Sequence, residues 1–345
     1  MSKFILISMI SLFSLGNVYG KSKVIVAVID SGIDINHPEL KESLWVNTAE
    51  IPNNNKDDDN NGFIDDVHGW DFVKNKPIKI DPNGHGTHIA GIISGKGIKE
   101  HFKKGMAYGA KIMAIRYYAA GQGGEENLTA SIKAFNYAIE NGAHIINYSG
   151  GGPKPDRRER NIIQKAYQKN ITVIAAAGNF GKNLTNGAGF YPASYPFDNI
   201  ISVAANDRNG KLITPSNYGI KNVDLSALGK EVLSTLPNNK YGKMSGTSQA
   251  TAQVTALAAR LMMKEPHLMN SPKELAYRLA YVGLRHPALK RKIATEAYLD
   301  PRRTFKIKSL SVDAFGDAII PNPILDALLQ PGADEIDALS QYLLQ

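Results

Sequence analysis

Short apolar runs alternate along the chain with segments of helical periodicity. The runs predict strands at residues 24–29, 111–116, 144–148, 171–176 and 200–204. Because they are apolar at successive positions rather than at every second one, they are typical of strands buried on both faces. Helices are predicted between them, at residues 86–94, 127–141 and 157–169. This alternation predicts an α/β fold, in which a doubly wound, mostly parallel sheet is flanked by helices.

The pattern changes after the last of these strands. Segment 247–264 is dominated by Ala, Thr, Leu and Met and is almost free of charge, which predicts a buried helix. Ser271, followed by Pro and three positions later by Glu274, predicts the start of the next helix with Ser271 as its N-cap. The periodicity then weakens, and Pro and Gly interrupt the chain. We therefore expect one domain over residues 21–300 and a small C-terminal appendage over residues 301–345.

The first 20 residues form a separate segment. Lys3 precedes an uncharged apolar run at residues 4–15, and Gly20 fits the last position before a cleavage site. This is the pattern of a secretory signal peptide. A buried helix and a membrane anchor are the alternatives, although a span needs about 20 apolar residues and this run is shorter. We expect residues 1–20 to direct export, to an extracellular or periplasmic location.

Composition adds two constraints. The 345 residues include no cysteine, so an exported domain must be stabilised by its core, by oligomerisation or by bound metal rather than by disulfides. The net charge is +8, but Lys and Arg are scattered and form no basic stripe interleaved with aromatic side chains. We expect a monomer that has no nucleic-acid partner and no membrane span.

Three segments carry side chains suited to catalysis. Asp30 lies at the end of the first apolar run, where it could also cap the turn that follows. His85 lies between two glycines at the start of a predicted helix, where a histidine can equally be structural. Ser248 begins the buried helix, either as a nucleophile aided by the helix dipole or as an ordinary N-cap. Each segment taken alone is weak evidence.

Taken together, the motifs Asp30-Ser31-Gly32, His85-Gly86-Thr87-His88 and Ser245-Gly246-Thr247-Ser248 resemble those of the subtilisin-like serine proteases, which have acid, histidine and serine in this order. The resemblance covers roughly residues 24–283 and implies a serine endopeptidase that acts on polypeptides. It implies that Ser248 is the nucleophile and that His85 takes its proton and passes it to the leaving amine. Asp30 then orients the imidazole and stabilises its charged form.

The resemblance also implies a substrate site. The segment Ala175-Ala176-Ala177-Gly178-Asn179 is similar to the oxyanion-hole segment of the family, with the side chain of Asn179 as a donor. The segment that begins at Ser149 is similar to the strand with which the substrate backbone pairs. The implied substrate-binding residues are Ser149, Gly150, Gly151, Ala176 and Gly178. The pocket for the residue before the scissile bond (P1) is expected between these two segments.

Two features depart from the family pattern. After the nucleophile, Ala252 and Gln253 stand where relatives commonly have Pro and His. Only nine residues, 21–29, separate the predicted cleavage point from Asp30, where secreted relatives usually carry a propeptide. Two alternatives therefore stay open. One is a catalytically weak binding protein with this fold, and the other is a processing protease whose C-terminal appendage is a partner or self-inhibitory element.

An acidic loop lies between Asp30 and His85, in an expected insertion near residues 47–73. Its D-x-D-x-N-G sequence has the spacing of the start of an EF-hand, but His68 stands where an EF-hand has its bidentate Glu. Closely spaced hard oxygen ligands favour Ca²⁺ over zinc, and a solvated acidic turn is the alternative. We expect a structural Ca²⁺ held by Asp57, Asp59, Asn61, the carbonyl of Phe63, Asp65 and Asp66.

Overall fold

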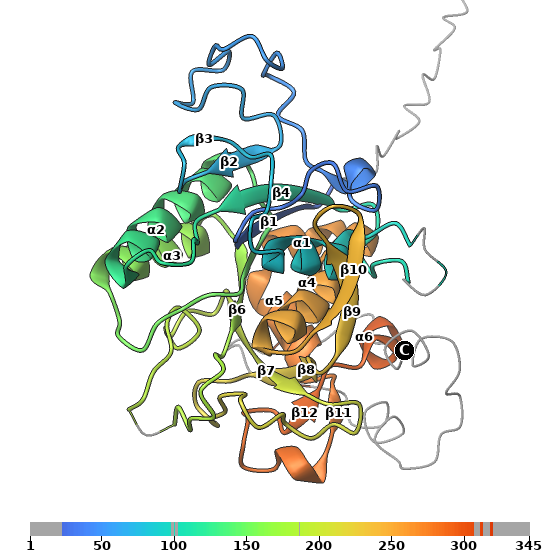
Figure 1. The fold of residues 1–345 in the computed structure, drawn as a ribbon. Coiled ribbons are helices and arrows are strands. Elements are labelled where there is room, and N and C mark those ends of the chain that lie inside the picture. The colour runs from blue at the N-terminus through green and yellow to red at the C-terminus, as the bar shows by residue number, and fades with distance from the viewer. Residues whose placement is uncertain are drawn as a thin grey trace, which may run out of the picture.

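A ten-stranded sheet forms the centre of the protein in this computed structural model (Figure 1). The structure describes residues 23–97, 100, 103–185, 187–306, 311–312 and 318–319. The strand order across the sheet is β11-β12-β8-β7-β6-β5-β1-β4-β2-β3. The strands are β1 (Ile25–Asp30), β2 (Gly69–Asp71), β3 (Lys76–Pro77), β4 (Lys111–Arg116), β5 (Ile145–Tyr148), β6 (Thr172–Ala176), β7 (Ile200–Asn206), β8 (Leu225–Leu228), β11 (Leu284–Arg285) and β12 (Ala297–Tyr298). Only the outermost pairs, β2 with β3 and β11 with β12, are antiparallel.

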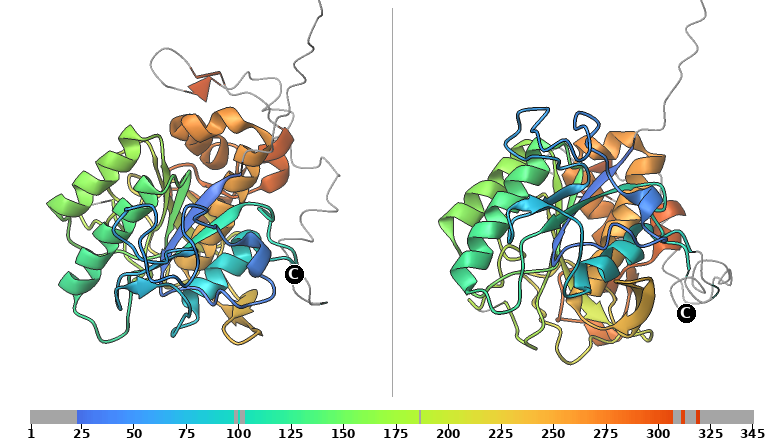
Figure 2. Two further views of the ribbon diagram at one scale, coloured as in Figure 1. Left: turned by 90° about the horizontal axis from the view of Figure 1, so that it is seen from above. Right: turned by 45° about the horizontal axis from the view of Figure 1, so that its top comes forward.

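Helices cover both faces of this sheet, as Figures 1 and 2 show. One face packs against α2 (Gly124–Glu140) and α3 (Arg157–Gln168). The other packs against α1 (His85–Ser94), α4 (Thr247–Lys264) and α5 (Pro272–Ala280). Each face has its own apolar core, which explains why the central strands are apolar at every position. The predicted α/β fold, with a mostly parallel sheet flanked by helices, is confirmed.

Helix α4 runs through the middle of one layer, and nearly all of its side chains are buried. The uncharged pattern of segment 247–264 predicted this position correctly. The predicted cap of the next helix is wrong in one detail, because the Ser271 side chain makes no capping hydrogen bond and the rigid Pro272 opens α5 without it. Sequence patterns identify such a cap, but the rotamer of the side chain decides whether its hydrogen bond forms.

Three further features lie outside this sheet. A hairpin of β9 (Val232–Leu236) and β10 (Lys240–Met244) packs beside α1, and the expected insertion forms a loop that extends from the body near β2 and β3 (Figure 1). Helix α6 (Pro301–Lys306) is joined to the domain by hydrogen bonds from Arg278 to the Thr304 carbonyl and from Arg303 to the Val282 carbonyl.

Beyond α6, the structure describes only two short paired strands, β13 (Ser311–Val312) and β14 (Ala318–Ile319). The predicted signal peptide, residues 1–20, and most of the predicted appendage therefore lie outside the described residues. Among the described residues, no helix combines the length and the apolarity that crossing a bilayer requires.

Candidate active site

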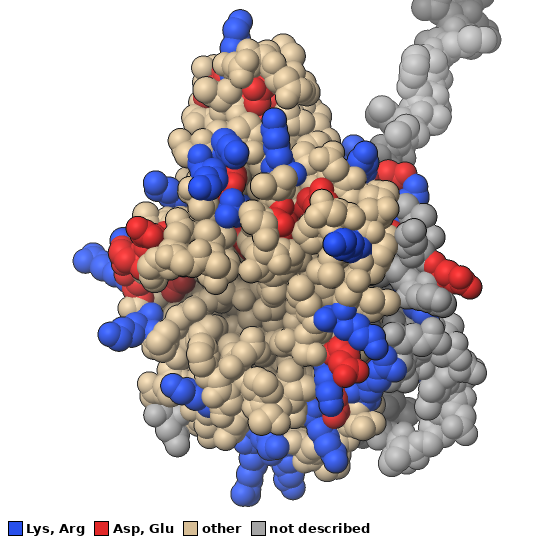
Figure 3. Space-filling model, viewed as in Figure 1, with Lys and Arg blue, Asp and Glu red and all other residues tan. Residues whose placement is uncertain are grey.

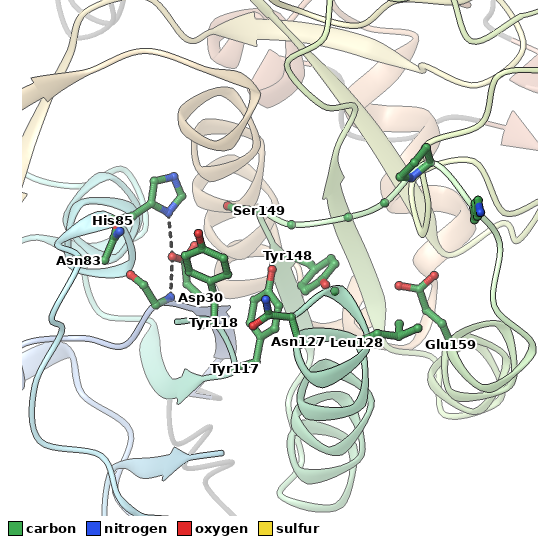
Figure 4. A pocket seen from close by; sticks show the side chains of 17 residues that line it. Asp30, Asn83, His85, Tyr117, Tyr118, Asn127, Leu128, Tyr148, Ser149 and Glu159 are labelled. Carbon is green, nitrogen blue, oxygen red and sulfur yellow. Dashed lines mark hydrogen bonds and ion pairs between the residues drawn. The ribbon is translucent and has the colours of Figure 1, made fainter. Parts of the chain in front are cut away.

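The fold brings Asp30 and His85 into direct contact. Asp30 is the last residue of β1, at the carboxyl end of the parallel strands, and His85 is the first residue of α1. One carboxylate oxygen of Asp30 lies 2.7 Å from His85 Nδ1 and also accepts the Ser31 backbone N–H at 2.7 Å (Figure 4). The side chain of His85 is 27% exposed, whereas Asp30 is buried. The hydrogen bond to Asp30 therefore fixes the Nδ1 edge of the His85 ring, while part of the ring remains accessible to solvent.

The surroundings of His85 set its protonation. Burial lowers the pKa of His85, but the negative charge of Asp30 and its hydrogen bond outweigh that effect and raise the pKa above its usual value. His88, one turn later, differs in this respect. It is fully buried, and burial lowers its pKa to about 4. His88 is therefore a neutral core residue, and His85 is the titrating histidine of this helix.

Asp81 holds the start of α1 in place, a role that no sequence motif indicated. Its carboxylate accepts the backbone N–H groups of Asn83, Gly84 and Thr87 and the hydroxyl groups of Ser31 and Thr87. Because Ser31 directly follows Asp30, Asp81 ties the end of β1 to the residues on both sides of His85.

A close approach of backbone completes this junction. A Cβ atom on Gly86 would lie 2.1 Å from the Gly32 carbonyl oxygen, so only glycine allows α1 to begin so near β1. The glycine that follows the histidine therefore serves a packing requirement.

Ser248 lies in the first turn of α4, where the backbone N–H groups have no partner within the helix. Its hydroxyl donates to the Ser149 carbonyl at 3.4 Å. Within the described residues this is the hydroxyl's one hydrogen bond, and none joins Ser248 to His85. Ser149, which this hydroxyl contacts, and His85 both line one pocket, whereas Ser248 itself is not among the residues that line it. Hydrogen bonds between nucleophile and base are often long without substrate and tighten when it binds.

Asn179 lies directly beside the start of α4. Its side-chain oxygen accepts the Thr247 N–H at 2.9 Å, so its amide nitrogen is left as the group available to a ligand. Asn217 holds this loop. Its side chain accepts from the backbone of Phe180 and Lys182 and donates to the Ala177 carbonyl. The Asn179 side chain is thus held by the Thr247 N–H, and the backbone on either side of Asn179 is held by Asn217.

The segment after β5 offers a free backbone edge. Within the described part of the chain, the backbone groups of Gly150 and Gly151 have no hydrogen-bond partner, and the ladder resumes only where Gly152 pairs with Tyr191. Ser149, Gly150 and Gly151 line a pocket of about 760 Å³ that also contains Asp30 and His85 (Figure 4). Three of the predicted substrate-binding residues are thus exposed to one pocket.

The expected P1 region is more crowded. Ala176 is buried at the end of β6, and neither Ala176 nor Gly178 belongs to the lining of that pocket. Phe190 occupies the space between the two segments. A Cβ atom on Gly151 would lie 2.5 Å from its ring, and one on Gly178 would lie 3.1 Å from it. The Phe190 ring therefore fills part of the space between the two segments.

The acidic loop is built around its aromatic residue. The Phe63 ring packs edge-on against Trp70, Phe72 and Tyr137, which anchors the loop to the body. The Asp57 carboxylate accepts the backbone N–H groups of Asn61 and the glycine that follows it, and so closes the turn.

The predicted calcium ligands separate into two groups. Asp59 and Asp66 converge with Glu50, and their carboxylate oxygens lie within 4.8 Å of one another. The Asn61 amide donates to both aspartates. Asp65 lies outside this cluster, because its carboxylate accepts the backbone N–H groups of residues 54 and 55.

Glu50 was missed because it precedes the motif by seven residues. Its carboxylate accepts the N–H groups of Asp58, Asp59 and Asp65, so it organises the loop backbone. Asp66 is fully buried, and burial raises its pKa although Tyr137, Asn47 and Asn61 donate hydrogen bonds to it.

On the face shown in Figure 3, the centre is hollowed and free of charged side chains, whereas Lys and Arg lie around its periphery. This distribution agrees with the scattered charge noted in the sequence.

Comparisons with known proteins agree with this geometry. A sequence model of the subtilase family matches residues 21–304. Subtilisin-like protease 1 of Plasmodium falciparum (isolate 3D7) is 32% identical over 318 residues, which is 86% of this chain and 45% of the relative. Thermitase of Thermoactinomyces vulgaris is 34% identical over 236 residues, 68% of this chain and 74% of the relative.

Solved structures give the same result for the fold. A cold-adapted subtilisin-like serine proteinase superposes with a TM-score of 0.61 and 25% identity, over 79% of this chain and 88% of that one. The chain spans only about half the length of the first curated relatives it matches, 45% for the Plasmodium protein and 53% for the thermophilic serine proteinase of Bacillus sp. (strain AK1).

Proposed function

The chain belongs to the subtilase family, and on this premise we propose that it is an exported serine endopeptidase with Asp30, His85 and Ser248 as its catalytic triad. The observation that carries this proposal is the 2.7 Å hydrogen bond between Asp30 and His85 Nδ1, at the carboxyl end of the parallel strands and in the same pocket as the Ser149 segment. That bond leaves Nε2 as the basic nitrogen of the ring.

The proposed reaction follows from the chemistry of these side chains. The Ser248 hydroxyl attacks the scissile carbonyl carbon while His85 Nε2 accepts its proton. The resulting imidazolium is stabilised by the buried Asp30 carboxylate. His85 then gives the proton to the leaving amine, and a water molecule repeats the sequence to release the acyl group from Ser248.

Two donors are proposed for the oxyanion. The Asn179 side-chain amide is free to donate because its oxygen is occupied by the Thr247 N–H. The Ser248 backbone N–H is the second donor, and the positive end of the α4 dipole adds to it. Both donors are held in position before the negative charge forms, so no reorganisation is needed during the reaction.

Polypeptide substrates are proposed to add a strand along residues 149–151. The backbone groups of Gly150 and Gly151, which have no partner among the described residues, supply the hydrogen bonds of that strand. Backbone pairing requires an extended segment, so the site favours loops and unfolded chains. A monomer without a nucleic-acid partner is part of the same proposal.

A structural Ca²⁺ is proposed at Glu50, Asp59 and Asp66. The residues fit such an ion because three carboxylates converge there and two of them are buried, at Glu50 and Asp66. Carboxylate oxygens are the ligands that calcium prefers. The ion would neutralise their repulsion and tie the acidic loop to segment 47–50, with no part in the bond-breaking steps.

A fluorophosphonate probe tests the enzymatic proposal, because it reacts with an activated serine. The wild-type protein is expected to be labelled at Ser248, and Ser248→Ala is expected to be unlabelled. Ser245→Ala is a matched control, since Ser245 lies three residues earlier and its hydroxyl oxygen accepts the Glu231 backbone N–H. A folded wild-type protein that resists labelling would contradict the proposal and favour a binding protein with the subtilase fold.

A further inference from the structure

We infer that Glu159 is a specificity-determining residue that recognises a cationic side chain, Lys or Arg, at the fourth position before the scissile bond (P4). This inference rests on the proposed peptidase function. Glu159 lies in α3 and lines the pocket that contains Asp30 and His85 (Figure 4). In that view Glu159 is at the opposite end of the pocket from His85, on the far side of Leu128.

The carboxyl group of Glu159 is nearly buried but faces the pocket. The residue is 4% exposed. One carboxyl oxygen is bonded to the Tyr195 hydroxyl at 3.0 Å, and the other has no partner within the described structure. No ion pair involving Glu159 exists among the described residues, so its charge is uncompensated. An uncompensated buried carboxylate is costly, and a cation entering the pocket would remove that cost.

The walls of the pocket suit a cation as well. Tyr117 and Tyr148 line it, with ring centroids 5.3 Å apart, and aromatic faces attract ammonium and guanidinium groups. Gly150 makes room for them, because a Cβ atom there would lie 1.8 Å from the Tyr117 hydroxyl oxygen. Leu128 and Asn127, from α2, bring no charge to the pocket. Lys154 is the Lys or Arg side chain that lines the pocket, and it is exposed, so solvent screens its charge.

The position along the substrate follows from strand geometry. Alternate side chains of an extended peptide point to the same face, so the residues at P2 and P4 enter this pocket together. Because His85 acts at the scissile bond in the proposed reaction, P2 is assigned to the end of the pocket beside His85. Glu159 lies at the other end, beyond the Ser149–Gly151 edge, and therefore faces P4.

The charge of Glu159 depends on pH. Burial raises the pKa of Glu159 to about 7, the Tyr195 hydrogen bond opposes this rise, and the negative charge of Asp156 adds to it. Tyr195, Tyr148 and Tyr117 also face it, and they stay neutral because burial raises their pKa values. Lys154 is the cationic side chain that lines the same pocket. The carboxyl group is thus neutral below about pH 7 and ionised above it. Recognition of a cation is therefore present at high pH and is lost as the pH falls through 7.

Matched peptides separate this inference from the proposed function. Internally quenched peptides of one sequence carry Lys, norleucine or Glu at P4. Norleucine has the alkyl stem of Lys without its ammonium group. For the wild type at pH 8, kcat/KM for the Lys peptide is expected to exceed that for norleucine by about tenfold to a hundredfold, as for a partly buried ion pair. The Glu peptide is expected to be the poorest.

The ratio of the Lys to the norleucine rate is the diagnostic quantity. It is expected to rise between pH 6 and pH 8 in the wild type, and the titration of His85 cancels from it because both peptides need the same base. Glu159→Gln keeps the acceptor for Tyr195 but should bring the ratio near one and remove its pH dependence. Glu140→Gln makes the same change at an exposed residue of α2 that is paired with Lys165, and it should leave the ratio as in the wild type.

The possible results distinguish failure of the role of Glu159 from failure of the proposed peptidase function. Cleavage of all three peptides by the wild type with no preference for Lys at pH 8 overturns the role of Glu159 and leaves the peptidase function intact. A preference for Lys that is the same in Glu159→Gln, or that does not change with pH in the wild type, overturns it as well. Failure of the folded wild type to cleave any peptide or to react with the fluorophosphonate overturns the proposed function, and this inference with it.

Discussion

Replacement of Asp81 by alanine is expected to destabilise the protein and to slow the reaction of Ser248. The Asp81 carboxylate is buried and accepts five hydrogen bonds, from two hydroxyl groups and three backbone N–H groups. The Ser31 hydroxyl and the Thr87 hydroxyl can turn to other partners, and Asn83 is exposed to water. The backbone N–H groups of Gly84 and Thr87 are buried and have no such replacement.

The magnitude follows from these two donors. A hydrogen bond to a charged group contributes about 1.5–3 kcal/mol, so two buried ones amount to about 3–6 kcal/mol. This is a large part of a total stability of roughly 5–15 kcal/mol. For a chain of this size, about 2 °C per kcal/mol gives a decrease in Tm of roughly 6–12 °C. Displacement of His85 at the start of α1 should also lower the labelling rate about tenfold to a hundredfold.

Thermal unfolding is best measured in a Ser248→Ala background, which prevents self-digestion, and labelling by the fluorophosphonate is measured with Ser248 present. Asp81→Asn should lose about half as much stability, since the amide keeps one acceptor oxygen. Asp156→Ala is the control. Asp156 is the N-cap of α3 and accepts two backbone N–H groups at the surface, so its loss should cost about 1 kcal/mol. A loss in Asp81→Ala no larger than in Asp156→Ala would refute the reasoning.

Four further predictions concern chemistry, pH, metal and specificity. Asn179→Ala should lower kcat about 10²–10³-fold with little change in KM, which is the magnitude measured in subtilisin, a member of this family. An unchanged kcat would exclude Asn179 as an oxyanion donor. The acidic limb of kcat/KM should have its midpoint above 6.5, because neutral His85 is the base and its pKa is raised, and Asp30→Asn should move that limb to lower pH. EDTA should lower Tm by about 5 °C, which is the effect of removing a ligand whose free concentration is roughly 100 times its Kd. Glu50→Gln should remove this response to EDTA. Equal Tm values with EDTA and with Ca²⁺ in the wild type would exclude the site. Peptides with Ala at P1 should be cut faster than those with Phe. Phe190→Ala should change the ratio of the two kcat/KM values by about tenfold in favour of Phe. An unchanged ratio would show that Phe190 does not limit the size of the P1 side chain.

Much of the fold was predictable because its determinants are local. The buried strands are apolar at every position, and such runs predicted β1, β4, β5, β6 and β7 within one or two residues. The short edge strands were not predicted. Strands of two residues, such as β11 and β12, carry no periodicity, and only the neighbouring strand defines them.

The candidate site also contains residues that local sequence motifs indicate and residues that only the fold brings together. Asp30, His85, Ser248 and Asn179 could be named as candidates because short motifs of fixed spacing carry them. Asp81 and Glu50 were missed because their role lies in hydrogen bonds to backbone groups brought close only by the fold. A carboxylate that accepts backbone N–H groups leaves no pattern in the sequence.

The sequence by itself therefore determined the layers of the fold and the residue types and order of the proposed catalytic groups, because periodicity and short motifs are local properties of the chain. Only the tertiary structure decided which groups meet and in what surroundings. It placed Phe190 in the expected P1 region and a buried carboxyl, Glu159, opposite His85 across one pocket. Burial and charge compensation depend on neighbours distant in sequence, and these properties control the protonation of both His85 and Glu159.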